Sequence, residues 1–234
     1  MKLGVYGASG HAKEIFDLVT EMDPNKERWS EIVFVDDTKE RGVFQGCSRL
    51  PFQELCEEYS SEEIEFCIGV GEPRLKEILF EKVEKAGYAF TNIIYPGSYI
   101  SPSVKFGRGI IIKRHVSISS DTDIQDNVCI LSNVTIGHDV IIGKHSQIAS
   151  NAFIGGHVTM GDRTYLGTGS MLREEITVGE GVIVSMGAVV LKSVSDYVTV
   201  MGNPARIISN SRGEKVFKNR EEVYKATKIL EEGV

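Results

Sequence analysis

The sequence has little of what marks a metal-binding, secreted or membrane-inserted protein. Only four of its 234 residues are cysteines, and none shows a CxxC or other metal-ligand spacing, so a reducing compartment is their simplest setting. No apolar run reaches membrane-spanning length, and the first ten residues, MKLGVYGASG, lack the apolar centre of a signal peptide. We therefore expect a cytoplasmic protein without membrane insertion.

The chain also lacks an excess of positive charge. It has 26 Lys and Arg against 33 Asp and Glu, a formal net charge of −7 at pH 7. This balance argues against binding of nucleic acid or another polyanion. Small anionic ligands would bind only at local sites of suitable charge. The length of 234 residues allows a good core and favours two domains.

What the chain does have is a six-residue repeat over its second half. Every sixth residue from Ile100 to Val190 is large and apolar, and the residue four places after each is small or β-branched. Two inward positions in six suit a short strand and a corner. The corner position, three places after each large apolar residue, holds Gly, Asn, Asp or His with four exceptions. These residue types most readily adopt positive φ.

This repeat resembles that of the hexapeptide-repeat acyltransferases, whose left-handed parallel β-helix uses three hexapeptides per triangular coil. The resemblance implies about five coils, and it is the sole basis for expecting a left-handed β-helix. In such a helix, residue n lies one strand spacing, about 4.8 Å, from residue n+18. The repeat therefore assigns each residue from about 100 to 195 a place on a coil.

The preceding residues predict a small α/β, Rossmann-like domain with a parallel sheet. We expect strands at 2–6, 32–35, 66–70 and 89–94, a helix after the glycine turn at 7–11, and a helix over 73–86. The expected domains are thus 1–95, 96–208 for the β-helix, and a C-terminal tail of 209–234 that is helical and charged from 215 to 232.

The glycine turn, within YGASGH, is a candidate phosphate site, because backbone N–H groups at a helix start favour an anion. It lacks the full GxGxxG pattern, and a simple tight turn explains it equally well. Asp36 and Asp37 end the next expected strand, where carboxylates can accept hydrogen bonds from a ribose or base or can form a solvated turn.

Together with the coils, YGASGH and the Asp pair resemble the bacterial nucleotide-sugar N-acetyltransferases of bacillosamine and perosamine synthesis and the related sialic-acid O-acetyltransferases, the PglD/NeuD type. The resemblance covers nearly the whole chain. It implies acetyl-CoA as co-substrate, no metal, a nucleotide-linked sugar held by the N-terminal domain, and homotrimers with active sites between subunits. The residues implied for the sugar nucleotide are Gly7, Ser9, Gly10, His11, Asp36, Asp37, Gly69 and Gly71.

The repeat separates His138 from the other histidines of the coils. It lies one place before a corner, where the backbone conformation does not favour a histidine. The residue eighteen positions later is Gly156, which is preceded by Gly155. Two glycines stacked on a histidine predict an open slot beside its ring. The remaining histidines of the repeat occupy corners, where positive φ tolerates them. They are His115, His145 and His157.

We predict that His138 is the general base of acetyl transfer. An amine or hydroxyl that attacks a thioester must lose a proton, which neutral imidazole can accept. The acetyl group would lie along the glycine slot, where a backbone N–H would donate to the oxyanion. Asp139 would orient the ring, or would only turn the chain. The family supports the choice of base, because relatives carry a His-acid pair before an aliphatic-Ile-Gly run, as in residues 138–143.

The segment from Tyr197 to Arg206 resembles the closing segment of hexapeptide acetyltransferases, which borders the coenzyme site. Two positions depart from the family pattern: Gln147 replaces a second histidine, for which His145 is no simple substitute, and Gly137 replaces an acid. The residues expected around the coenzyme are Gly155, Gly156, Thr168, Ser185, Met186 and Arg206.

Three classes of function remain open. The leading one is N-acetylation of a nucleotide-linked amino sugar, with O-acetylation of a sialic-acid-like sugar as its nearest variant. The second is a zinc hydrolase of the hexapeptide carbonic anhydrase type, although His138, His145 and His157 lack the expected arrangement of three ligands. The third is a non-catalytic scaffold.

Overall fold

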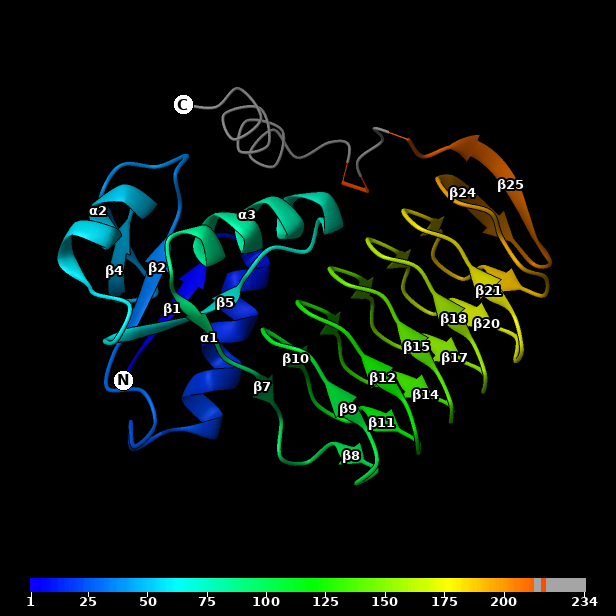
Figure 1. Ribbon diagram of the computed structural model, residues 1–234, viewed down its shortest axis with the longest axis horizontal. Helices are drawn as coiled ribbons and strands as arrows, with labels where there is room; N and C mark the ends of the chain where they lie inside the picture. The colour runs from blue at the N-terminus through cyan, green and yellow to red at the C-terminus, as the bar shows by residue number, and fades with distance from the viewer. Residues whose placement is uncertain (213–215, 218–234) are drawn as a thin grey trace. The chain divides into compact units, whose positions relative to one another are not determined.

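A computed structural model describes residues 1–212, 216 and 217. The chain divides into two compact units, residues 1–93 with Phe217, and residues 94–216 (Figure 1). The tail that we expected to be helical lies, apart from Val216 and Phe217, outside the described residues. Within the described residues, no helix is long and apolar enough to cross a membrane.

The first unit is built on a six-stranded sheet in the order β3-β4-β2-β1-β5-β6. All its strand pairs are parallel except β3 with β4. Fully buried side chains, such as Val5, Phe34 and Phe66, form its core. The elements are β1 (Lys2–Tyr6), α1 (Gly10–Met22), β2 (Ile32–Val35), β3 (Gly42–Phe44), β4 (Cys47–Leu50), α2 (Phe52–Glu58), β5 (Ile64–Ile68), α3 (Pro73–Lys85) and β6 (Ala89–Phe90).

The expected strands 2–6 and 32–35 agree with β1 and β2, but three elements were not foreseen. The β3–β4 hairpin turns at Gln45 and Gly46, both with positive φ, and α2 follows it. The expected strand 66–70 is wrong by two residues, because β5 is already paired with β1 at Ile64. The expected strand 89–94 is two strands, β6 in this sheet and β7 (Ile93–Ile94) in a different sheet, at the boundary of the two units.

The second unit is a parallel β-helix whose strands form three sheets, here called faces 1, 2 and 3. Face 1 contains β7 (Ile93–Ile94), β10 (Ile111–Ile112), β13 (Cys129–Ile130), β16 (Gln147–Ile148), β19 (Tyr165–Leu166), β22 (Ile183–Val184), β24 (Val198–Gly202) and β25 (Ala205–Asn210). Face 2 contains β8 (Tyr99–Ile100), β11 (Ser117–Ile118), β14 (Thr135–Ile136), β17 (Phe153–Ile154), β20 (Met171–Leu172) and β23 (Val189–Val190). Face 3 contains β9 (Lys105–Phe106), β12 (Asp123–Ile124), β15 (Ile141–Ile142), β18 (Thr159–Met160) and β21 (Thr177–Val178).

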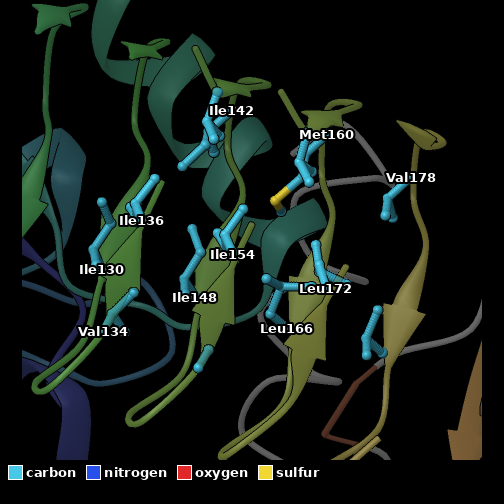
Figure 2. Close-up of a cluster of buried hydrophobic side chains, with 14 of the residues drawn as sticks. Ile130, Val134, Ile136, Ile142, Ile148, Ile154, Met160, Leu166, Leu172 and Val178 are labelled. Atoms are coloured by element: carbon cyan, nitrogen blue, oxygen red, sulfur yellow. The ribbon is translucent and has the colours of Figure 1, made fainter. Parts of the chain in front are cut away.

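The pairing confirms the expected register of eighteen residues. Ile112 pairs with Ile130, which pairs with Ile148, and the same spacing holds on faces 2 and 3. Figure 2 shows the large apolar residues of successive coils projecting into the interior, where they are fully or almost fully buried. The column begins one repeat earlier than expected, because Ile94 already packs against this core.

The corners also follow the predicted position. Each predicted Gly, Asn, Asp or His corner has positive φ, and so do two of the exceptions, Arg163 and Glu175. Near the end of the helix the register shortens to sixteen residues, with Val184 paired to Val200. The antiparallel strand β25 then pairs with β24.

We expect Ile148→Ala to destabilise the β-helix by about 2–5 kcal/mol, because it leaves a cavity in the fully buried core. Ile148→Val should cost only about 0.5–1.5 kcal/mol. Thermal unfolding followed by calorimetry tests this order. Thr159→Ala, at an exposed outward position, is the matched control and should leave the midpoint nearly unchanged. Equal effects of Ile148→Ala and Thr159→Ala would contradict the assigned core.

Candidate active site

Gly7 and Gly69 lie together where β1 and β5 end. A Cβ built on Gly7, whose φ is +121°, would come within 2.9 Å of the Gly69 carbonyl oxygen. The chain leaves β1 for β2 on one side and returns to β5 on the other, so the strand order reverses here. Ligands of open α/β sheets bind outside the carboxyl ends of strands at such a point. Gly71 follows three residues after β5 and is half-buried.

The start of α1 faces open space at Gly10, where an added Cβ would meet nothing within 4 Å. Ser9 is the N-cap residue, and its side chain makes no capping hydrogen bond. Lys39 donates a hydrogen bond to the Ala8 carbonyl at 3.1 Å, which brings a positive charge to the glycine turn. His11 is largely buried, with Nδ1 3.4 Å from Glu14. The turn therefore combines free space, backbone N–H groups and a cation, as an anion site requires.

Asp36 and Asp37 have different surroundings. Asp37 Oδ1 accepts the Phe52 N–H at 2.8 Å, and Oδ2 accepts Lys82 Nζ at 2.7 Å and the Tyr6 hydroxyl. Asp36 Oδ1 accepts hydrogen bonds from Thr38, while its Oδ2 lies 3.6 Å from Lys39 Nζ.

The pKa values reflect these contacts. Burial alone would raise the pKa of Asp37, but the hydrogen bonds from Lys82, Tyr6 and Phe52 outweigh it, so this pKa is lowered. Burial raises the pKa of the Tyr6 hydroxyl, and the charge of Asp37 raises it further. Asp37 is thus a charged anchor of the first unit, whereas Asp36 pairs with Thr38 and Lys39 of its own loop. A cavity of about 520 Å³ lies beside this loop, lined by Asp37, Thr38, Lys39, Glu40, Arg41, Pro51 and Glu54.

His138 stands at the corner between β14 of face 2 and β15 of face 3. Its Nδ1 lies 2.7 Å from Asp139 Oδ2, a hydrogen bond in which the ring N–H donates when the proton is on Nδ1. The other ring nitrogen, Nε2, points to Gly156, where an added Cβ would lie only 3.0 Å away. The glycine therefore leaves room beside the nitrogen that would accept a proton.

The same corner is tightly packed at Gly137. A Cβ on Gly137 would lie 2.6 Å from the Gly156 nitrogen, so this backbone has no room for an acid there. Asp139 has φ of 57°, so it turns the corner and also holds the ring. The two roles considered for Asp139, orienting the His138 ring and turning the chain, are therefore compatible.

His157 is a neighbour of this pair that we assigned only to turning a corner. Its φ of 58° fits that role. Its ring also lies edge-on to the His138 ring, with centroids 4.9 Å apart, and its Nε2 is 3.9 Å from Asp139 Oδ2. The sequence already indicates that Asp139 and His157 are neighbours, because they are eighteen residues apart.

The expected coenzyme residues occupy different corners of one chain. Gly155 and Gly156 share the corner between faces 2 and 3 with His138, whereas Thr168 and Met186 lie between faces 1 and 2. Met186 is 77% exposed and directly follows Ser185. Arg206, on β25, lines a separate cavity of about 550 Å³ together with Val190, Leu191, Lys192, Ser193, Val194, Val200, Pro204, Ala205 and Ile207.

Gln147 and His145 are both buried and lie apart from this corner in the coil. His145 Nδ1 is 3.0 Å from Asn127 Nδ2 of the preceding coil. Among the described residues, the group that could hold a metal ion is His138, Asp139 and His157, and it does not include His145. The three-histidine site of a zinc hydrolase is therefore not formed within the described chain.

Comparison with known proteins agrees with these two parts of the molecule. Residues 2–83 match the PglD N-terminal domain model, and residues 121–156 match the bacterial transferase hexapeptide model of six repeats. WeeI from Acinetobacter baumannii AYE is 30% identical, with a TM-score of 0.82 over 89% of this chain and 100% of its own. The chain belongs to the PglD-type hexapeptide-repeat sugar acetyltransferases. This membership confirms the expected acyltransferase and its left-handed β-helix.

Two further members of the family have been solved with ligands. The acetyltransferase domain of PglB from Neisseria gonorrhoeae FA1090, in complex with acetyl coenzyme A, is 29% identical, with a TM-score of 0.80 over 88% of this chain and 98% of its own. PerB from Caulobacter crescentus, in complex with CoA and GDP-perosamine, is 26% identical, with a TM-score of 0.80 over 89% of this chain and 98% of its own.

We expect Asp37→Asn to destabilise the protein by about 1–3 kcal/mol at pH 7, because it removes the charge that pairs with Lys82. Since the folded-state pKa is lowered, the charged Asp37 contributes its full stability above the unfolded pKa of about 3.9. That contribution is lost as the pH falls below this value. The melting difference between wild type and variant should therefore be constant from about pH 7 to 5 and narrow below about pH 4.

Thermal unfolding at several pH values measures this difference. Glu54→Gln, which removes an exposed partner of Arg41, is the control and should change stability by less than about 0.5 kcal/mol. A difference for Asp37→Asn that is as large at pH 3 as at pH 7 would show that the charge of Asp37 is not the stabilising element.

Proposed function

We propose that the protein transfers the acetyl group of acetyl-CoA to the amine of a nucleotide-linked amino sugar, with His138 as general base. The main support for the proposal is the geometry of His138. Its Nδ1 is within hydrogen-bond distance of Asp139, while its Nε2 faces the space left by Gly156. With the proton on Nδ1, the Nε2 lone pair is available to the attacking amine. The ligands named for the PglB domain and PerB support acetyl-CoA and a nucleotide-linked sugar as substrates.

The proposed reaction is a direct transfer. As the amine nitrogen bonds to the thioester carbonyl carbon, Nε2 of His138 takes its proton, and the imidazolium is stabilised by Asp139. The carbonyl oxygen becomes negative in the tetrahedral intermediate. Among the described residues the Gly156 N–H makes no hydrogen bond, so it can donate to that oxygen. The intermediate then collapses with release of CoA, whose thiolate can take up the proton.

For the sugar nucleotide, we propose the glycine turn as the phosphate site. The Ser9 hydroxyl and the N–H groups near Gly10 would donate to phosphate oxygens, with Gly7, Gly69 and Gly71 leaving room for the chain to approach. Asp36 would accept a hydrogen bond through its Oδ2, and His11 would border the site. Asp37 would act by anchoring the loop, since its oxygens already accept three hydrogen bonds.

We further propose a homotrimer in which the coenzyme lies between two subunits. Gly155 and Gly156 occupy one corner, Thr168, Ser185 and Met186 another, so a neighbour is needed to bring both sets to one coenzyme. Exposed apolar side chains of face 2 between these corners, Phe153 and Met171, support such a contact. Arg206 would meet a coenzyme phosphate. The four free cysteines support a cytoplasmic setting.

The test of the reaction is release of CoA from acetyl-CoA in the presence of UDP-, GDP- and dTDP-linked 4-amino sugars and CMP-sialic acid. Turnover with an amino sugar supports N-acetylation. Turnover with CMP-sialic acid alone would replace it by the O-acetyl variant, and no turnover with any acceptor would overturn the proposed function.

We expect His138→Asn to lower kcat by about two or more powers of ten, as removal of a general base does. Steady-state rates with the accepted sugar measure the loss. His115→Asn is the matched control, because His115 is an exposed histidine of the same β-helix at a corner with φ of 58°. Retention of a tenth or more of the activity in His138→Asn would rule out the assigned base.

We expect Gly156→Ala to lower kcat/KM about tenfold or more without lowering the melting temperature. The new methyl group would lie 3.0 Å from His138 Nε2 and would displace the ring and fill the slot. Glu174→Ala, one coil further along the same corner, is the control and should keep normal activity. An active Gly156→Ala enzyme would mean that substrates do not approach His138 from this side.

A further inference from the structure

The corner that carries His138 holds three metal-ligating side chains in one group. One ligand atom each from His138, Asp139 and His157 lies within 4.8 Å of the others. Asp139 Oδ2 is the shared member, 2.7 Å from His138 Nδ1 and 3.9 Å from His157 Nε2. The proposed acetyl transfer assigns no role to His157.

The backbone fixes these residues on adjacent coils. The His157 N–H donates to the His138 carbonyl at 2.9 Å, and both Asp139 and His157 turn corners with φ near 57–58°. The three side chains are each about half exposed, so small rotations do not disturb the core. Ligand atoms of a tetrahedral zinc site lie about 3.3 Å apart, so the two distances given above must each change by about 0.6 Å. The ligand atoms of the two histidines lie within 4.8 Å of each other and must approach by up to about 1.5 Å.

The donor set defines the kind of ion. Two imidazoles and one carboxylate suit Zn²⁺ and similar transition metals, whereas Mg²⁺ and Ca²⁺ prefer oxygen ligands. Glu175 occupies the same corner as His157 on the next coil, one strand spacing of about 4.8 Å away. Its carboxylate adds negative charge beside the site.

We propose that His138, Asp139 and His157 form a site for Zn²⁺, and that the bound ion reversibly inhibits acetyl transfer. This inhibition rests on the proposed function of His138, whereas the binding does not. The ion takes the place of the proton between His138 Nδ1 and Asp139 Oδ2. A neutral imidazole bound to metal through Nδ1 carries its proton on Nε2, so the nitrogen facing Gly156 has no lone pair for the acceptor amine.

The binding is tested with EDTA-treated, dialysed protein titrated with ZnCl₂ in a calorimeter and with CoCl₂ by visible absorption. We expect one ion per chain at this site and a tetrahedral cobalt spectrum. His157→Asn removes one ligand and suits the corner, where asparagine recurs at Asn127, Asn133 and Asn151. It should weaken binding by at least about tenfold. His115→Asn should bind as the wild type does.

Inhibition is measured by loss of the thioester, because zinc also binds the free thiol of CoA. Without metal, His157→Asn should keep wild-type activity within about threefold. Zinc should inhibit the wild type and His115→Asn reversibly, and the half-inhibitory concentration should rise at least about tenfold in His157→Asn. Cys56→Ser, which removes an exposed thiol, should leave that concentration unchanged.

Each outcome has a distinct meaning. Zinc binding or inhibition that is equal in wild type and His157→Asn overturns the proposed site, as does the absence of binding. If zinc binds through His157 but His138→Asn remains fully active, the site stands and the assigned base fails. Loss of metal-free activity in His157→Asn would overturn the proposed inhibitory site, because His157 would then belong to the transfer site itself.

Discussion

The parallel pairing of residue n with residue n+18 is the constraint on which the β-helix depends. The strands from β7 to β23 have only two residues each, so a coil is held mainly by hydrogen bonds to the coils before and after it, such as Gly137 N–H to the Ile154 carbonyl at 2.8 Å. A slip of one residue would turn every inward isoleucine outward. The fixed register also places His138, Asp139, Gly156 and His157 on neighbouring coils of one corner.

This register is why so much of the second unit could be predicted from the sequence. The inward column, the corners and the position of His138 against Gly156 all follow from counting. Arg163 and Glu175 show that position decides more than residue type, since both adopt positive φ although neither is a typical corner residue. Their neighbours in the ladder impose that conformation, and a residue-by-residue preference misses it.

The first unit has no such repeat, so the sequence predicted its helices and strands less accurately. The hairpin of β3 and β4 has strands of three and four residues with little alternation, so the pattern alone did not indicate it. The role of Asp37 depends on Lys82, forty-five residues away, and on Tyr6 from another strand. Contacts between distant elements decide whether a carboxylate binds a ligand or anchors a loop, and the Asp-Asp pair looks the same in either case.

The exposure of the histidine corner constrains how any catalysis there must work. His138 and Asp139 have side chains that are 59% and 47% exposed, so in a single chain water reaches the base as readily as an acceptor does. Direct transfer to an amine rather than to water requires that water be excluded when the substrates are bound. We propose that the acceptor, the coenzyme and a neighbouring β-helix supply this cover against water, so the proposed trimer and the proposed reaction depend on each other.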